Sequence, residues 1–502
     1  MSPTATPTAI PIKDASLSTL ESRAFRGGVS LVARQSITKG VGLVANIMLA
    51  RLLSPTEFGI YACVVCWMQF FNLTGDLGFG ASLVRQVEEP TAEQESTVFF
   101  AQLALFSLPS LLVVALAPIC VATFKLPPDV VWLIRLMSLS GVIACFKTIP
   151  SARLERALKF DKLARVDVLE SIVWNVSVVS LAFAGKGVWS FAIASLVSQI
   201  ASVALLKLIE PWRVRMICSV AIIRERLRFG AQLQGSTVAS FIKDSFTPFF
   251  IGNVCGAAAV GLVNFANTVA TYPTWFAALF GRIYYSLFSR AQHDPDRLRE
   301  IVHSCLWWNN VAVLGLTSIL LPLTDVSVPI VFGQKWSSAV PLIYLFAVVN
   351  PFTATVWPLL ALCNAMGRTD VSLKYSLLQM FGPWIIALPL TKIFGPIGFA
   401  YGCVIMQSIN LYVFVKAKRM FGLSLFKPIV PVLSAASLNA LVIFIASRLL
   451  PVNSSMSVVL FCVCGCASFA LLTDSFSKHR LTRSAKSLVV LLLRNGPVED
   501  AI

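Results

Sequence analysis

Long apolar runs separated by short polar breaks fill the chain between residues 29 and 474. A helix that crosses the hydrocarbon core of a bilayer needs about 20 mostly apolar residues. Measured against that length, the pattern predicts fourteen membrane-spanning helices. They fall at residues 29–51, 57–80, 97–123, 129–148, 167–184, 188–207, 231–251, 258–281, 303–323, 337–363, 371–391, 396–415, 428–449 and 455–474. The predicted fold class is an all-α membrane protein.

Composition excludes the class of soluble globular proteins. Of the 502 residues, 57% are hydrophobic and only 13% are charged, and the mean hydropathy is +0.78. Soluble domains usually carry about 25% charged residues. So little polar surface cannot cover a core of this size in water, and the apolar runs are therefore assigned to a multi-pass membrane protein.

The basic residues fix the orientation of the predicted helices. The chain has a formal net charge of +17 and contains 41 Lys and Arg residues. With the N-terminus in the cytoplasm, six of these fall in loops on the outer side and 32 on the cytoplasmic side. Membrane proteins carry such an excess in their cytoplasmic loops. We therefore predict that both termini are cytoplasmic, and we expect no nucleic-acid partner because topology accounts for the positive charge.

Three short landmarks recur in the same order in the two halves of the chain. The pairs are ARLLSPTEFGIYA at 50–62 with NVCGAAAVGLVNFA at 253–266, KFDKLAR at 159–165 with RTDVSLK at 368–374, and GVWSFAIASLVSQ at 187–199 with GPIGFAYGCVIMQ at 395–407. In the first pair a glycine follows a small residue by five positions in each copy, at Gly59 and at Gly261. This predicts two six-helix lobes in a parallel pseudo-twofold repeat, related by an axis along the membrane normal.

The repeat and the span boundaries together predict five parts. They are a cytoplasmic N-terminal tail at 1–28, a first six-helix lobe with its cytoplasmic linker at 29–229, a second six-helix lobe at 230–424, two additional transmembrane helices at 425–476, and a basic cytoplasmic tail at 477–502. The two C-terminal helices fall outside the repeat.

Ionisable side chains inside predicted spans cost about 2.5–3.5 kcal/mol each on insertion scales, and they usually face a protein interior or a watery cavity. The cations within spans or at their ends are Lys39, Arg135, Lys243 and Arg282. We interpret them as lining a water-filled cleft between the lobes that binds a phosphate head group. The alternative interpretation is structural, with the charges neutralising neighbours or extending toward the bilayer surface.

Two acidic residues and three amides complete the polar candidates. Asp76 and Asp244 are candidates for ion coupling or for charge pairing. Asn72, Asn264 and Asn267 can line a cavity for hydroxyl-rich cargo, or can equally tie helices together. We expect no catalytic residue, no cofactor and no metal site, because most cysteines lie in apolar runs without a nearby His and pack there as small hydrophobes.

Several segments carry a family resemblance. They are LARLLSPTEFGIYA in the first hairpin, DLGFGASLVRQ at 76–86, GLVNFANTV at 261–269 and NAMGRTDVSLKYSLL at 364–378. Together, over about residues 30–420, they resemble the polysaccharide flippases of the Wzx type, which belong to the multidrug/oligosaccharidyl-lipid/polysaccharide exporter superfamily.

The resemblance implies a bacterial inner-membrane protein with two lobes facing each other in a V. It implies that undecaprenyl-diphosphate-linked sugar units move from the cytoplasmic to the periplasmic leaflet by alternating access. The expected partners are the lipid-linked oligosaccharide, membrane lipids, and a polymerase with other polysaccharide-assembly proteins. The family motifs supply no catalytic residue, so the candidate cations above rest on their positions in the spans alone.

Two other functions remain as alternatives. A drug or cation antiporter of the same superfamily would need an acidic cavity, whereas the charges within spans here are mainly cationic. A membrane enzyme of polysaccharide assembly usually presents a large extracytoplasmic loop with acidic or His residues. The predicted outer loops are short, and the three His residues all lie on the predicted cytoplasmic side.

The predicted topology can be tested with reporter fusions. A reporter fused after residue 335 is expected to read as periplasmic and one fused after residue 228 as cytoplasmic, because the loops that hold them carry opposite shares of the basic residues. Alkaline phosphatase and green fluorescent protein activities measure the two sides. The reverse pattern would overturn both the orientation and the parallel repeat.

Overall fold

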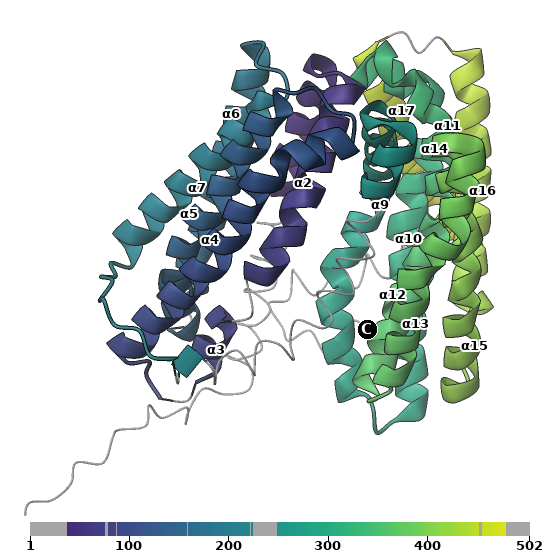
Figure 1. Cartoon of the computed structure of the whole chain (residues 1–502). Coiled ribbons are helices and arrows are strands. Elements are labelled where there is room, and N and C mark those ends of the chain that lie inside the picture. The colour runs from purple at the N-terminus through teal and green to yellow at the C-terminus, as the bar shows by residue number, and fades with distance from the viewer. Residues whose placement is uncertain are drawn as a thin grey trace, which may run out of the picture.

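The computed structural model describes residues 38–75, 79–86, 88–157, 159–220, 222–223, 248–450 and 454–477. Within these ranges it contains helices and no strand, which confirms the all-α fold class. Figure 1 shows two bundles of helices that meet at one end and diverge toward the other. We call the bundle before residue 224 the first lobe and that from 248 to 421 the second lobe. The lobes meet at the crossing end, and the opposite end is the far end.

Helices of the first lobe fall on each predicted run from 29–51 to 188–207. They are the helix at 38–52, α2 (Pro55–Gly75), α3 (Phe79–Arg85), α4 (Ala92–Thr123), α5 (Val130–Arg156), α6 (Phe160–Phe183) and α7 (Trp189–Ile209).

The second lobe begins with a helix at 248–255 and contains several distorted segments. Its further elements are α9 (Ala257–Arg290), α10 (Pro295–Ser327), the π-helical η1 (Val328–Phe332), the 3₁₀-helical η2 (Gln334–Ala339), α11 (Val340–Ala347), α12 (Asn350–Ala365), α13 (Thr369–Gly382), η3 (Pro383–Ala387), α14 (Leu388–Ile405), η4 (Met406–Ile409) and α15 (Asn410–Phe421). Two more helices, α16 (Phe426–Leu449) and α17 (Ser455–Phe476), follow it.

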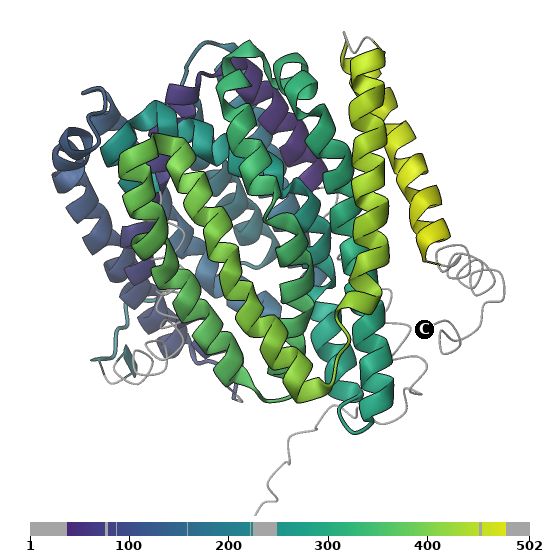
Figure 2. The same ribbon diagram turned by 90° about the vertical axis from the view of Figure 1, so that its right-hand side faces the viewer.

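Eight helices in the described ranges are long and apolar enough to cross a membrane, or nine if the bent pair Gln334–Ala347 and Asn350–Ala365 forms one span. One of the eight, Thr369–Phe421, covers two of the predicted runs. The chain turns between them at Gly395, whose φ of 62° and ψ of −144° are not helical. Figure 2 shows the two arms side by side. The count of fourteen spans stays a prediction.

The polar break before α2 is a helix start with its own hydrogen bonds. The Ser54 backbone N–H donates to Glu57 Oε2 at 2.7 Å, and the Glu57 backbone N–H donates to Ser54 Oγ at 3.3 Å. This reciprocal pair is a capping box, which satisfies donors that the first helical turn leaves unpaired. The sequence SPTE therefore ends the helix at 38–52 and begins α2 within a few residues.

The pair KFDKLAR and RTDVSLK has the same backbone geometry in both lobes. Lys159 precedes α6 with φ −87° and ψ 53°, and Arg368 precedes α13 with φ −92° and ψ 56°. The Lys159 N–H donates to Leu154 O at 2.9 Å, and the Arg368 N–H donates to Cys363 O at 2.8 Å. Each bond spans five residues, so the two lobes form this helix junction in the same way.

The pair of segments that starts at Gly187 and Gly395 repeats in the same manner. Gly187 has a φ of 53° and Gly395 a φ of 62°, in the left-handed region that side chains with a Cβ rarely adopt. Each glycine lies in the turn between two antiparallel helices, α6 and α7 or the two arms of Thr369–Phe421. The weak sequence matches therefore mark a structural repeat.

Gly59 and Gly261 lie where α2 of the first lobe crosses α9 of the second, and the two helix backbones come close together there. A Cβ at Gly59 would lie 1.7 Å from Ala257 O, and a Cβ at Gly261 would lie 1.9 Å from Pro55 O. Each of these Cβ positions is also 3.0 Å from the backbone N of the other glycine. The contact is symmetric, because Pro55 and Ala257 each precede their glycine by four positions. Only glycine permits helices to approach this closely.

An apolar core surrounds the crossing and contains residues of both lobes. Phe124, at the end of α4, packs edge-on against Phe249 of the second lobe with ring centroids 4.8 Å apart. Phe265 of α9 stacks on Trp336 at 4.0 Å, and Phe58 of α2 meets the same indole edge-on at 5.3 Å. The lobes are thus joined through one continuous core at the crossing end.

The two C-terminal helices pack beside α10, along one side of the second lobe (Figure 2). Asn439 of α16 donates to Ser318 Oγ of α10 at 2.9 Å, and Ser468 of α17 donates to the Asn439 amide oxygen. Such amides tie helices together within the bilayer. These helices enlarge the second lobe without touching the crossing.

Enlarging either crossing glycine is expected to destabilise the fold. Gly59→Ala and Gly261→Ala each place a methyl group against a backbone carbonyl and should lower the free energy of unfolding by about 1–3 kcal/mol. Thermal unfolding of the detergent-solubilised protein measures the change. Gly42→Ala is the control, since a Cβ there meets no atom within 4 Å. Equal stability of all three variants would show that the helices do not cross at these glycines.

Candidate functional site

A pocket of about 430 Å³ lies between the lobes beside the crossing. Both lobes supply its walls, in which aromatic rings and uncharged polar groups lie beside the smaller side chains of Ala62, Val65, Cys66 and Pro248. The aromatic residues are Phe58, Tyr61, Trp174, Phe191, Phe265, Tyr272 and Phe332, and the polar residues are Asn46, Gln69, Asn264 and Thr268. Among the described residues that line the pocket there is no Asp, Glu, Lys, Arg or His.

The aromatic wall of the first lobe is held by ring packing. Tyr61 of α2 stacks on Phe191 of α7 with centroids 4.0 Å apart and planes 13° from parallel. Phe58, one turn before Tyr61, meets Phe191 edge-on at 5.8 Å. Stacked and edge-on pairs fix the rings more firmly than apolar contact alone. The pocket therefore presents ordered ring faces.

The amides face the pocket from opposite lobes. Asn46 belongs to the helix at 38–52 of the first lobe, while Asn264 and Thr268 lie one turn apart on α9 of the second. An amide offers both donors and an acceptor, and a hydroxyl offers one donor and two acceptor lone pairs. Such a set can hydrogen-bond to hydroxyl groups and carries no net charge.

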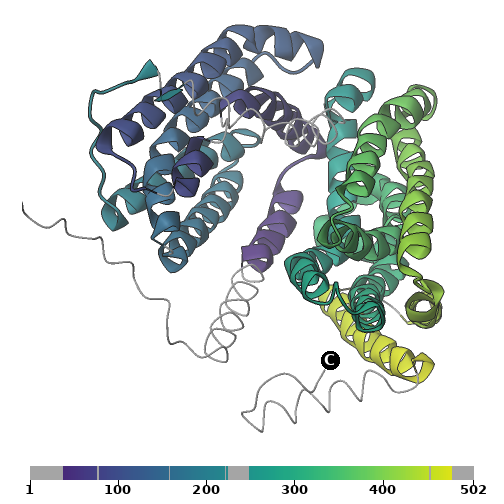
Figure 3. The ribbon, with the colours of Figure 1, turned by 90° about the horizontal axis from the view of Figure 1, so that it is seen from below.

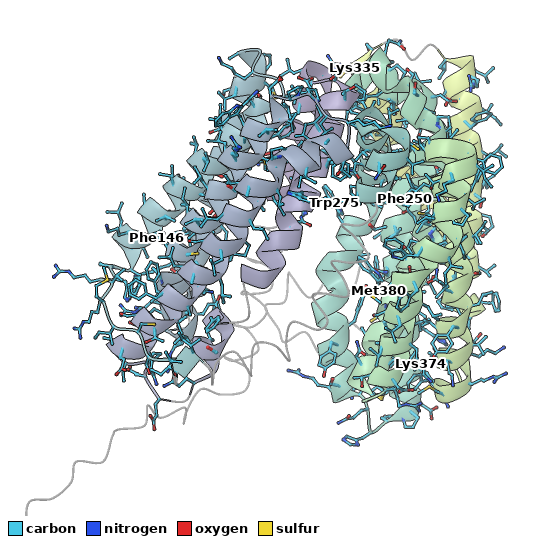
Figure 4. All side chains as sticks on the ribbon, viewed as in Figure 1. Phe146, Phe250, Trp275, Lys335, Lys374 and Met380 are labelled. Atoms are coloured by element: carbon cyan, nitrogen blue, oxygen red, sulfur yellow. The ribbon has the colours of Figure 1, made fainter. Side chains whose placement is uncertain are left out.

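A cation lies next to the pocket on the side of the far end. Lys39 of the first lobe places its Nζ 4.5 Å from the centroid of the Trp275 ring on α9. Tyr272 of the pocket wall meets the same indole edge-on at 4.7 Å. Figure 4 shows Trp275 between the two lobes. Lys39 is two helical turns before Asn46, so the backbones of these two residues are about 10 Å apart along that helix.

Polar ties join the lobes above the pocket at the crossing end, where Figure 4 labels Lys335. Arg51 of the first lobe donates from Nε to Val331 O at 2.6 Å and from Nη2 to Ile330 O at 2.5 Å. In return, Lys335 Nζ donates to Arg51 O and Trp336 Nε1 donates to Ala50 O, both at 2.8 Å. The end of the helix at 38–52 thus donates to carbonyls of η1 and accepts from side chains of η2. We call these four hydrogen bonds the interlobe latch.

Several predicted site residues are placed by the structure. Asn264 lines the pocket, and Lys39 lies beside it at the lobe interface. Asn267 is exposed on α9 and does not line the pocket. Arg135 lies elsewhere: its guanidinium stacks over Trp132 on its own helix at 4.7 Å.

The face of α5 that carries Arg135 points away from the second lobe. Helical spacing puts Trp132, Leu139 and Phe146 on the same face, and all three are exposed. Figure 4 shows Phe146 on the side of the first lobe that is remote from the second. The structure therefore does not bring Arg135 to the interlobe pocket.

The remaining predicted residues fall outside what the structure describes. Asp76, Lys243 and Asp244 are not among the described residues. Position 72 lies on α2 and position 282 on α9, but the side chains of Asn72 and Arg282 are likewise outside the description. Their roles stay predictions.

Sequence reasoning missed most of the pocket. Asn46 is seven residues after Lys39 and so shares its helix face, a signal that helical spacing alone contains. Tyr61 and Trp174 gave no such signal, because aromatic residues are common in spans and only packing decides which of them faces a cavity. It also missed the ion pair of Lys147 with Glu170 at 2.7 Å between α5 and α6.

The chain is similar in sequence to proteins of polysaccharide biosynthesis. A family model described as "Polysaccharide biosynthesis protein" matches residues 48–341, more than half of the chain. The chain is 26% identical over 410 residues to the lipopolysaccharide biosynthesis protein WzxC of Escherichia coli strain K12, covering 77% of this chain and 79% of that protein. It is also 26% identical over 345 residues to the succinoglycan biosynthesis transport protein ExoT of Rhizobium meliloti strain 1021, covering 68% and 69%.

Solved structures share the fold at low sequence identity. The lipid II flippase MurJ in an inward closed conformation matches with a TM-score of 0.74 and 12% identity, over 90% of this chain and 99% of that one. An inward-facing multidrug resistance MATE family transporter of the MOP superfamily matches with a TM-score of 0.56 and 15% identity, over 79% and 99%. At these identities the matches establish the two-lobed architecture and nothing finer.

Breaking the interlobe latch is expected to loosen the crossing end. The double variant Arg51→Ala, Lys335→Ala removes three solvent-exposed bonds from charged donors, each of which contributes about 0.5–1.5 kcal/mol. Cys66, which is buried and lines the pocket, should then react at least about tenfold faster with a membrane-impermeant maleimide when it is the only cysteine retained.

Lys186→Ala is the matched control, because Lys186 is an exposed cation at the same end of the first lobe. It should leave the labelling rate of Cys66 unchanged. Equal rates in the control and the double variant would show that the latch does not hold the lobes together.

Proposed function

The chain belongs to the polysaccharide biosynthesis protein family, and on that basis we propose that it flips an undecaprenyl-diphosphate-linked oligosaccharide from the cytoplasmic to the periplasmic leaflet of a bacterial inner membrane. The protein is a multi-pass membrane transporter and not an enzyme, in keeping with relatives such as ExoT. The observation that carries the proposal is the uncharged pocket shared by both lobes, whose aromatic walls carry amide and hydroxyl groups, with the Lys39 ammonium beside it.

Each part of such a substrate meets suitable chemistry. Sugars and a diphosphate do not dissolve in the hydrocarbon core, whereas the polyprenyl tail does. The pocket offers amides and hydroxyls to the sugars, and Lys39 offers a positive charge to the diphosphate. Opposite charges about 4 Å apart attract by about 4 kcal/mol at an effective dielectric constant of 20. Lys39 can therefore hold the anionic part of the substrate below the bilayer surface.

Further cations are proposed for the same role. Position 282 follows Asn264 by five full helical turns on α9, so it lies on the face of that helix that borders the pocket. Lys243 precedes Gly256 by about as many positions as Lys39 precedes Ser54 in the other lobe. Arg282 and Lys243 are thus the candidates that would extend the positive charge from Lys39 toward the far end.

Movement between leaflets needs the pocket to open to each side in turn. The lobes are joined at the crossing end by the glycine contact and the interlobe latch, and Figure 3 shows them apart when seen from the far end. With the predicted orientation, the far end faces the cytoplasm, which is the side from which the substrate enters. We assign ion coupling to Asp76 and Asp244 as the candidate carriers.

The drug or cation antiporter is the second candidate, and the pocket argues against it. An antiporter for cations needs carboxylates where the cargo binds, and none lies among the described residues that line the pocket. The charged group beside the pocket is a lysine, which repels cations. Membrane lipids and the proteins of polysaccharide assembly, a polymerase among them, are the proposed partners.

Complementation of a deletion strain tests the proposal. The strain without this protein should lose its surface polysaccharide and accumulate lipid-linked oligosaccharide in the cytoplasmic leaflet. Lys39→Ala should lower the surface polysaccharide at least about tenfold because the diphosphate loses its counter-charge, and Lys39→Arg should restore it. Surface polysaccharide and extracted lipid-linked sugar are measured.

Lys186→Ala serves as the control for the loss of a cation, and immunoblots of membranes check the amount of each variant. A deletion strain with normal surface polysaccharide and no accumulated lipid-linked sugar would exclude the proposed function. Normal export by Lys39→Ala would exclude the role of Lys39 alone.

A further inference from the structure

We infer that the interlobe pocket is a subsite for the uncharged sugars of the substrate, which enters with its glycan toward the crossing and its diphosphate at Lys39. This inference rests on the proposed function and adds the polarity of binding and the class of sugar. It is carried by the order of chemical groups along the interface and by the absence of charge from the described pocket lining.

The walls of the pocket fit pyranose rings. A pyranose has an apolar face of C–H groups and a rim of hydroxyls. The Tyr61 ring is fixed against Phe191, and Trp174 of α6 presents an indole on the same side of the pocket. Aromatic rings bury large apolar area with few rotatable bonds. Asn46 and Asn264 then reach the hydroxyl rim from the two lobes.

The pocket lining discriminates against charged sugars. A buried carboxylate without a counter-charge is strongly unfavourable, while a hydroxyl is satisfied by one amide or hydroxyl partner. Glycan units that carry uronic acids are therefore expected to bind less well here than neutral units of the same length. In this arrangement Lys39 is occupied by the diphosphate, and the guanidinium of Arg51, on the same helix, is occupied by the carbonyls of Ile330 and Val331.

The order of the two subsites sets the direction of the substrate. The helix at 38–52 ends at the interlobe latch, so Lys39 lies nearer the far end and Asn46 nearer the crossing. On α9, Asn264 precedes Trp275 by eleven residues, a rise of about 16 Å in the same direction. Glycan near the crossing and diphosphate near Trp275 thus leave the lipid tail toward the far end.

The test separates the subsites by binding each half of the substrate alone. Saturation-transfer NMR with detergent-solubilised protein measures maltotetraose and chitotetraose as neutral glycans, tetragalacturonate as the acidic glycan of equal length, and dodecyl diphosphate as the anionic lipid. Native protein is expected to bind at least one neutral glycan about tenfold more tightly than tetragalacturonate.

Two substitutions should have opposite effects. Trp174→Ala should weaken the binding of the neutral glycan about tenfold and leave dodecyl diphosphate unchanged, whereas Trp174→Phe retains a ring and most of the affinity. Lys39→Ala should weaken the binding of dodecyl diphosphate about tenfold and leave the neutral glycan unchanged. Trp132→Ala, which removes an exposed indole outside the pocket, should change neither.

Three outcomes would overturn the inference: no saturable binding of either neutral glycan, equal or tighter binding of tetragalacturonate, or loss of glycan binding in Lys39→Ala to the same extent as in Trp174→Ala. Thermal unfolding of Trp174→Ala and Trp174→Phe confirms that each variant is folded. Failure of these glycan experiments, with dodecyl diphosphate still bound at Lys39 and export intact in cells, would leave the proposed function standing. Normal export of polysaccharide in a strain without the protein would exclude both the proposed function and this inference.

Discussion

The contact of Gly59 with Gly261 is the constraint on which the architecture depends. Two helices can approach until backbone meets backbone only where neither carries a side chain, and here each glycine would place a Cβ within 2 Å of a carbonyl oxygen on the other helix. The contact is symmetric because equivalent residues of the repeat meet each other. It therefore lies on the pseudo-twofold axis, and it fixes which faces of α2 and α9 are turned toward the space between the lobes.

The position of the pocket follows from that geometry. Phe58 and Tyr61 flank Gly59 on α2, and Asn264 and Phe265 follow Gly261 on α9, so each helix supplies pocket residues within one or two turns of the contact. The interlobe latch closes the space above them, and the Lys39 ammonium lies below. From the crossing end toward the far end, the interface between the lobes thus presents the latch, then the pocket with its rings and polar groups, and then a cation.

The sequence predicted the fold well because the strong hydrophobic pattern and the weaker internal repeat indicate the same arrangement of helices. Apolar runs of spanning length predicted helices that the structure has, and the repeated glycines at 59 and 261 proved to be the crossing itself. The pocket was less predictable. Asn264 was identified as a polar residue in a span, but Asn267 is exposed and does not line the pocket, because a shift of three residues turns the side chain by about 60°.

Arg135 is a residue that the sequence assigned to the cavity and that the structure places on the outer face of the first lobe. Its cost in the bilayer suggested a cavity, yet an adjacent indole on its own helix provides a partner on the outer face. The apolar composition of the span shows that a charged residue is unusual there, but only the packing of the helices decides which way its side chain points.

The interlobe latch has one more consequence, which concerns evolution. Arg51, Lys335 and Trp336 all donate to main-chain oxygens, so the side chains of the acceptor residues Ala50, Ile330 and Val331 take no part in these bonds. Mutations at positions 50, 330 and 331 can accumulate without abolishing the acceptors, provided that the backbone keeps its path. Distant homologues can therefore keep the interlobe latch even where the residues at the acceptor positions differ.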